Sequence, residues 1–290
     1  MLRRSLSLLR RFGRLYTEKR LTRAAAALSF FLTTTIFPLI IILYTLLGSS
    51  YDRIMRILGF ANEVMAGQSA RAMEEFLRYV AKNNSPSMMM AALLLLVTSA
   101  SAAVRTLQAT IGELQGRQRY QGLSDFLFSI IFSLIFLAAL YFAVLVMLTG
   151  KEVLAWFNSF LPLFDTGSVW LVLKYPLLAA IDYGLLCGIF LVSMPRHERY
   201  PIHAGALLAT VATVGVCVAF SVFIGASARY PLVYGSLASI ILLMLWMYTF
   251  CLVICCGAAW NVALRDERTE ERQRRYVPKH KEQNKEQKNR

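Results

Sequence analysis

The stretch YGSLASIILLMLWMYTFCLVICCGAAWNVAL occupies residues 234–264 and contains no charged side chain. The charged tetrapeptide RDER follows it at once. A helix of about 20 apolar residues is long enough to cross the hydrocarbon core of a bilayer. The stretch therefore predicts a transmembrane helix, and the small residues within it raise the question of what packs against them.

The composition extends this prediction to the whole chain. Of the 290 residues, 57% are hydrophobic and only 17% are charged, whereas soluble domains are about 45–50% apolar and about 25% charged. We predict an all-α polytopic membrane protein. Its six transmembrane helices are expected at about 24–48, 88–111, 126–150, 169–194, 202–227 and 234–263.

The distribution of Lys and Arg predicts the orientation of these spans. Of the 31 basic residues, 22 lie in the two terminal segments and in the 112–125 and 195–201 loops, and 7 lie in the other three loops. Basic residues accumulate on the cytoplasmic side of membrane proteins. We therefore expect both termini to be cytoplasmic.

The basic N-terminal segment, residues 1–23, has the pattern of an amphipathic helix. Leu2, Leu6, Leu9 and Tyr16 fall roughly on one face, with arginines around the other. A helix of this kind lies at the membrane interface against anionic headgroups. The alternative is a plain topology signal, and the two interpretations are compatible.

Two further segments flank the membrane domain of residues 24–264. The extracytoplasmic loop 48–87 has apolar residues at helical spacing and predicts one or two amphipathic helices. The tail 265–290 is strongly charged, and we expect a solvated cytoplasmic segment that is helical at first and then disordered. Because the positive-inside rule accounts for the net charge of +14, we expect no nucleic-acid partner.

Small residues at helical spacing predict where the spans touch. Gly235 and Ser239, Gly184 and Gly188, and Gly257 with its neighbours lie on such faces. In lipid, small residues allow helices to approach closely. We expect these faces to pack within the bundle, and a homo-oligomer interface is the competing use.

The ionisable residues within spans are the candidates for function. Asp182 lies deep in the fourth span, where a charge costs several kcal/mol unless it meets a partner, water or a proton. Arg105 lies at a similar depth, with Gln108 and Asn261 nearby in depth. We predict a polar cavity lined by these residues, and the alternative is a structural ion pair. Pro38 predicts a kink in the first span.

No cofactor or metal site is predicted. The five cysteines all lie in apolar runs and the three histidines are scattered, whereas metal sites need ligands at defined spacing. The carboxylates lie mainly in the tail and the first loop, and no G-x-S-x-G or H-E-x-x-H motif is present. We therefore expect the chain not to be an enzyme.

Several stretches resemble one bacterial family. They are AAALSFFLTTTIFPLI, SASAAVRTLQATI, MPRHERYPIHAGALLAT and the opening stretch from Tyr234 to Leu264. Together they resemble the YihY/BrkB family of bacterial inner-membrane proteins, once labelled "ribonuclease BN". The resemblance implies six spans and a plasma-membrane location, but no settled activity. Where Ala259 stands here, the family usually has Glu.

Two functions are consistent with these features. The first is a transporter or permease-like protein for a small solute, ion or lipid. The second is a non-transporting membrane scaffold or envelope assembly factor that acts through its basic helix and charged tail.

Overall fold

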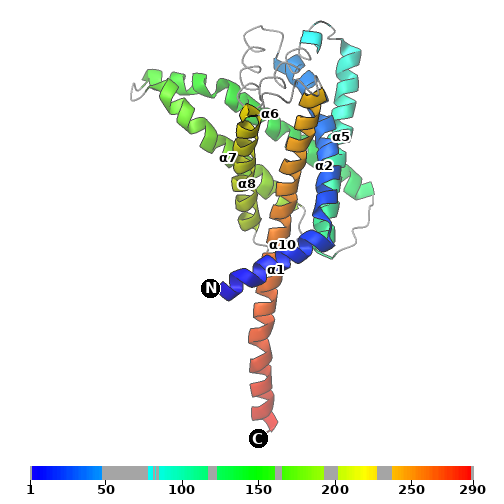
Figure 1. The fold of residues 1–290 in the computed structure, drawn as a ribbon, viewed down its shortest axis with the longest axis vertical. Helices are drawn as coiled ribbons and strands as arrows, with labels where there is room; N and C mark the ends of the chain where they lie inside the picture. The colour runs from blue at the N-terminus through cyan, green and yellow to red at the C-terminus, as the bar shows by residue number, and fades with distance from the viewer. Residues whose placement is uncertain are drawn as a thin grey trace.

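The computed structural model describes residues 2–47, 78–80, 82, 85–116, 123–160, 165–192, 202–226 and 237–288. The long elements in this part of the chain are all α-helices, which confirms the all-α prediction there (Figure 1). They are α1 (Leu2–Glu18), α2 (Leu21–Leu47), α5 (Pro86–Leu114), α6 (Leu123–Phe160), α7 (Thr166–Val192), α8 (Ile202–Ala226) and α10 (Leu237–Lys288).

Five of the described helices are long and apolar enough to cross a membrane. The qualifying segments are Leu21–Ile42, Pro86–Leu114, Gly167–Leu191, Ile202–Phe223 and Ile241–Glu270. Helix α6 contributes a shorter apolar segment, Ser129–Ala143. The count of six spans therefore stays a prediction, and α6 is the helix that would complete it.

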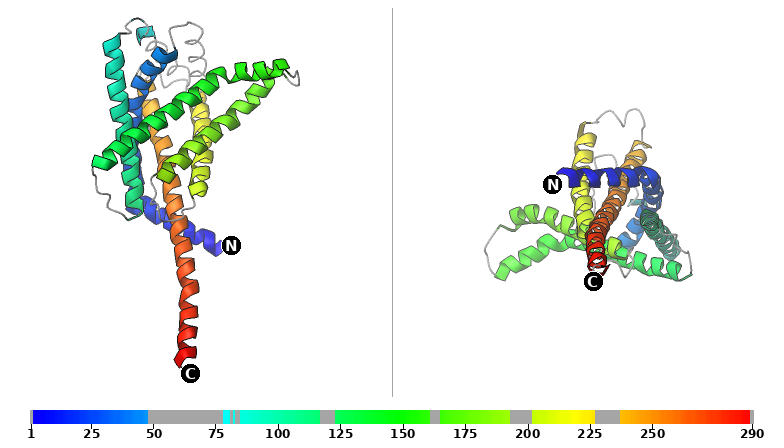
Figure 2. Two further views of the ribbon diagram at one scale, coloured as in Figure 1. Left: turned by 180° about the vertical axis from the view of Figure 1, so that it is seen from behind. Right: turned by 90° about the horizontal axis from the view of Figure 1, so that it is seen from below.

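Helix α10 occupies the centre of the bundle. It packs against α2 and α8 most extensively, and also against α5 and α1 (Figures 1 and 2). The side chains at these contacts are mostly small, as close helix approach in lipid requires. The fully buried positions include Cys251, Cys255, Ala259, Ala206 and Ala209.

The outer surface of the bundle is apolar. Large hydrophobic side chains on several helices are more than half exposed, among them Leu94, Val211 and Val222. A soluble protein rarely exposes so much apolar surface. This surface is what a helix facing lipid requires, so the exposure agrees with the apolar composition of the spans.

Helices α6 and α7 form a hairpin that leans away from the other helices (Figure 1, in green). The two helices approach closely near Gly150 and Trp170, where a Cβ added to the glycine would collide with the indole ring. The returning end of α7 packs against α8. This arrangement places α7 on α8 rather than on α5.

Helix α1 crosses α10 at the base of the bundle, and α10 continues well below it (Figure 1). The chain turns from α1 into α2 at Arg20, whose φ of 49° lies in the left-handed region. The predicted disordered end of the tail is wrong, because α10 remains helical as far as Lys288. The tail is rich in Glu, Gln, Lys and Arg, which have high helix propensity.

Some predictions fall outside the described residues. The helices expected in the 48–87 loop lie almost wholly there, and so does Gly235. For Leu2, Leu6 and Ser239 the structure describes the helical backbone but not the side chain.

Candidate functional site

Asp182 lies between α7 and α8. It is about 15 Å along the axis of α7 from Val192, at about 1.5 Å per residue. The hydroxyl of Thr210 on α8 faces its carboxyl group, but the two do not form a hydrogen bond of good geometry. The Oδ2 atom is shielded from solvent and has no hydrogen-bond partner among the described residues.

Two threonines of α8 differ from most threonines in the described helices, and Thr33 of α2 is a further exception. Thr210 and Thr213 have buried hydroxyl groups with no hydrogen-bond partner in the described part of the chain. A threonine inside a helix usually donates to the carbonyl four residues earlier. Ten threonines here do so: Thr17, Thr34, Thr35, Thr45, Thr98, Thr106, Thr110, Thr149, Thr249 and Thr269.

The same face of α8 continues to Cys217. Thr210, Thr213 and Cys217 are three and four residues apart, so they form one stripe. Asp182 lies beside Thr210, at one end of this stripe, and it interacts electrostatically with the Cys217 thiol at the other end. Thr213 lies between Thr210 and Cys217 on the stripe. We name Asp182, Thr210 and Thr213 the Asp182 cluster.

A second polar group lies on the same two helices, nearer to α1. The Tyr183 hydroxyl and His203 Nδ1 are 2.8 Å apart, and the two rings are stacked with centroids 6.3 Å apart. The Cys187 sulfur is 3.9 Å from the same nitrogen. His203 is exposed and lies in the first turn of α8. The polar stripe of α8 therefore begins at the end of the bundle where α1 lies.

Arg105 and Gln108 lie on α5, away from Asp182. Within the described residues, no ion pair joins Arg105 to Asp182. The buried Gln108 accepts a weak hydrogen bond from Ser129 of α6, at 3.5 Å. The structure thus separates the candidates by helix, and the cavity that they were expected to share stays a prediction.

Asn261 connects α10 to the beginning of α8. Its Oδ1 accepts a hydrogen bond from the Gly205 N–H at 2.7 Å, and its Nδ2 donates to the Ile202 carbonyl at 3.2 Å. The first N–H groups of a helix lack partners within it, and a side chain from a neighbouring helix supplies one here. A Cβ on Gly205 would collide with the Gly257 carbonyl and with Asn261. Asn261 therefore has a structural role, because its hydrogen bonds join α10 to α8.

Two predicted packing glycines and the predicted kink residue lie on α7 and α2. Gly184 and Gly188 face open space, since an added Cβ would meet nothing within 4 Å. Pro38 lies inside α2. Near it, the hydroxyls of Thr34 and Thr35 donate to backbone carbonyls one turn earlier.

Asp165 begins α7 at the outer end of the hairpin. Its carboxylate accepts hydrogen bonds from the Ser168 hydroxyl at 2.7 Å and from the Ser168 N–H at 3.0 Å. These bonds hold the pKa of Asp165 below its usual value. An exposed aspartate on the same helix as Asp182 offers a matched control for substitutions.

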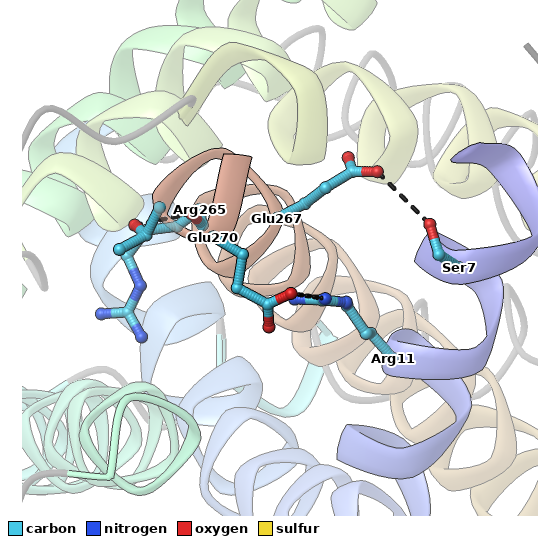
Figure 3. Close-up of polar contacts among 6 residues, drawn as sticks. Ser7, Arg11, Arg265, Glu267 and Glu270 are labelled. Atoms are coloured by element: carbon cyan, nitrogen blue, oxygen red, sulfur yellow. Dashed lines mark hydrogen bonds and ion pairs between the residues drawn. The ribbon is translucent and has the colours of Figure 1, made fainter. Parts of the chain in front are cut away.

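Polar contacts join helix α1 to α10 at the base of the bundle (Figure 3). Arg11 Nη2 lies 2.5 Å from Glu270 Oε2, and the Ser7 hydroxyl donates to Glu267 at 3.4 Å. The bond to Glu270 raises the pKa of Arg11. The Phe12 ring packs edge-on against Trp260, with centroids 5.8 Å apart.

The apolar residues predicted to share one face of α1 do not all have the same surroundings. Phe12, Leu15 and Tyr16 pack against the core, whereas Leu9 is 58% exposed. Leu9 and Tyr16 therefore do not share one environment. The sequence pattern located the helix, but it did not show that α10 would take up part of its apolar surface.

The apolar helices and the lipid-facing surface define a multi-pass helical membrane protein. The chain belongs to the "Virulence factor BrkB" family, whose sequence model matches residues 12–282. This match confirms the family to which the sequence stretches pointed.

Two curated relatives are similar to the chain. The "Putative ribonuclease-like protein YfkH" of Bacillus subtilis is 25% identical over 264 residues, which cover 86% of this chain and 92% of the relative. A "UPF0761 membrane protein" of Chromobacterium violaceum is 42% identical over 60 residues, or 21% of this chain and 14% of the relative. No solved structure matches the chain.

Proposed function

We propose that the chain is a permease-like membrane protein that binds a small polar solute or ion at the Asp182 cluster. One observation carries this proposal: Asp182 Oδ2, the oxygen of the facing Thr210 hydroxyl and that of the Thr213 hydroxyl, one turn further along α8, are buried without hydrogen-bond partners among the described residues. A buried polar group left unpaired costs about 1–3 kcal/mol. A bound ligand that supplies the missing contacts would offset this cost.

The position of the cluster supports the same function. It lies well inside two helices that are long enough to cross a membrane. Ionisable residues at such depth mark ion and substrate pathways in membrane proteins. Oxygen ligands favour a polar solute or a hard cation over an apolar lipid chain. A lipid is therefore the less favoured substrate.

The expected orientation belongs to the same proposal. We propose that both termini lie in the cytoplasm and that α1 lies at the cytoplasmic surface of the membrane. The exposed Leu9, Arg10 and Arg14 support this, because they face away from α10. Anionic headgroups are the partner that such a face would meet.

Helix α10 favours a second candidate function, that of a non-transporting scaffold. Its charged part extends far beyond the bundle (Figure 1). Deleting residues 272–290 leaves the contacts of Glu267 and Glu270 in place. If the deletion abolishes the cellular phenotype and Asp182→Asn does not, the scaffold is the better account.

That the chain is not an enzyme belongs to the same proposal. Its carboxylates lie mainly in the tail and the first loop, and they are interleaved with Lys and Arg. A homo-oligomer stays a prediction, and cysteine crosslinking at the open Gly184–Gly188 face would test it.

Native mass spectrometry of the purified protein tests the permease proposal. We expect a small molecule or ion of defined mass to remain bound to the wild type. It should be lost in Asp182→Asn and in the double variant Thr210→Val, Thr213→Val. It should persist in Asp165→Asn, which keeps its helix cap. Identical spectra for all four proteins would contradict the proposal.

A further inference from the structure

We infer that Asp182 is a proton-binding group that exchanges protons with the solution at the α1 end of the bundle. The inference rests on the proposed function, since it adds a proton-binding step to the site that takes the solute or ion. It goes further by fixing the chemical step and the side from which the proton arrives.

The surroundings of Asp182 lack a compensating charge. Among the described residues, the polar neighbour of its carboxyl group is the Thr210 hydroxyl, and no cation acts on it. The titratable groups of α8 on this face are Cys217 and His203, and His203 lies two turns before Thr210. On α6, which packs against α7, the described titratable groups are Tyr141, Lys151 and Glu152, and none of them contributes to the electrostatic environment of Asp182.

A lone carboxylate at this depth costs several kcal/mol unless it binds a proton or a cation. Protonation removes the charge and adds one O–H donor. The step is balanced in itself: a hydronium ion from the solution gives its proton to a carboxylate oxygen of Asp182, an O–H bond forms, and water remains. Release to the same solution is the reverse step.

The helix geometry favours a proton over a metal cation. Metal cations such as Ca²⁺ and Mg²⁺ take about six or more oxygen ligands, and transporters supply many of them from unwound backbone. Helices α7 and α8 are continuous around the cluster. Pro176 frees the carbonyl of Val172, but that carbonyl lies about 15 Å along α7 from Asp182. The Asp182 cluster offers one carboxylate and two hydroxyl groups, fewer oxygen atoms than the six or more that such a cation takes, whereas a proton needs only one.

The side of access follows from His203. It is exposed in the first turn of α8, on the stripe that contains Thr210 and Thr213, and about 10 Å along the axis from Thr210. Tyr183, the neighbour of Asp182 in sequence, holds the His203 ring by stacking and by the 2.8 Å contact. We assign Tyr183 a positioning role.

Infrared difference spectroscopy of the full chain in lipid nanodiscs tests the inference. Between acid and alkaline pH, we expect a carbonyl-stretch band of a protonated carboxyl group that shifts in D₂O. It should be lost in Asp182→Asn and kept in Asp165→Asn. Thr210→Val, which retains Asp182, should shift the band because a neighbouring hydroxyl is removed. His203→Gln should keep the band but slow its exchange with D₂O.

Two results would overturn the inference. They are the absence of the band in the wild type and an unchanged band in Asp182→Asn. A bound solute in native mass spectra without a titrating band would contradict only the proton step and would leave the permease proposal intact.

Discussion

Substitution of Gly205 by Ala tests the contact between α8 and α10. The new Cβ would lie closer than 3.0 Å to the Gly257 carbonyl and to the Asn261 side chain, a separation that real Cβ atoms essentially never show. Overpacking of this kind costs about 1–3 kcal/mol. Displacing Asn261 also breaks its hydrogen bond to the Gly205 N–H, at a further cost of about 1–3 kcal/mol. The helix propensity gained from Ala returns at most about 1 kcal/mol, so we expect a net loss on the order of 3 kcal/mol.

Gly184→Ala is the matched control for this prediction. An added Cβ there meets nothing within 4 Å, so only the propensity gain of up to about 1 kcal/mol remains. The free energy of unfolding, measured by SDS titration in mixed micelles, compares the two variants directly. If Gly205→Ala is as stable as Gly184→Ala, the close approach of α8 and α10 at this point is wrong.

Three further predictions concern single contacts. Glu270→Gln removes the charge that pairs with Arg11, and because the pair is partly exposed the substitution should lower the free energy of unfolding by only about 0.2–1 kcal/mol. The distribution of spin-label distances between α1 and α10 should broaden. An unchanged distribution would show that this pair does not hold α1 against α10. Thr35→Val removes the 3.0 Å hydrogen bond to Ser99 between α2 and α5 and should cost about 0.6 and at most about 1.7 kcal/mol in SDS titration. The pKa of Asp165 is lowered by the hydrogen bonds that it accepts, so its stabilising contribution is present above its usual value of 3.8 and is lost as the pH falls through the lowered pKa. Asp165→Ala should therefore destabilise the protein at neutral pH and match the wild type in strong acid, and an equal difference at both pH values would contradict this reasoning.

The helices could be predicted from the sequence because apolar runs long enough to cross a membrane have few alternatives. The expected spans 88–111 and 202–227 correspond to α5 (Pro86–Leu114) and α8 (Ile202–Ala226) within a few residues. Helix ends followed from the first charged or turn-forming residues. The tail was the exception, since charge there was taken as a signal for disorder although its residues are strong helix formers.

The lateral arrangement of the helices could not be predicted in the same way. Depth along a helix follows from counting residues, but which neighbour a residue faces depends on how the helices pack. Arg105 and Asp182 therefore looked like partners by depth, while α7 packs against α8 and α6 rather than against α5. Asn261 was placed near the candidates by depth too, yet it caps the beginning of α8.

The threonines of the Asp182 cluster carried a weak signal in the sequence. Thr213 lies on one stripe of α8 with Gly205 and Ala209, and small residues at this spacing are typical of helix packing. Only the structure distinguishes its hydroxyl from the ten that are bonded to their own helix. A threonine near the depth of an intramembrane aspartate is the pattern that would have identified this site.

The three buried oxygens of the Asp182 cluster define the proposed site, and a high-resolution cryo-electron microscopy map tests their positions most directly. The chain of 32.7 kDa would be studied in nanodiscs with a bound antibody fragment. We predict that the side chains of Asp182, Thr210 and Thr213 converge, with a water or ligand density within hydrogen-bond distance of at least two of them. If both threonine hydroxyls instead donate to carbonyls of α8 and no density lies near the carboxyl group, the proposed site does not exist.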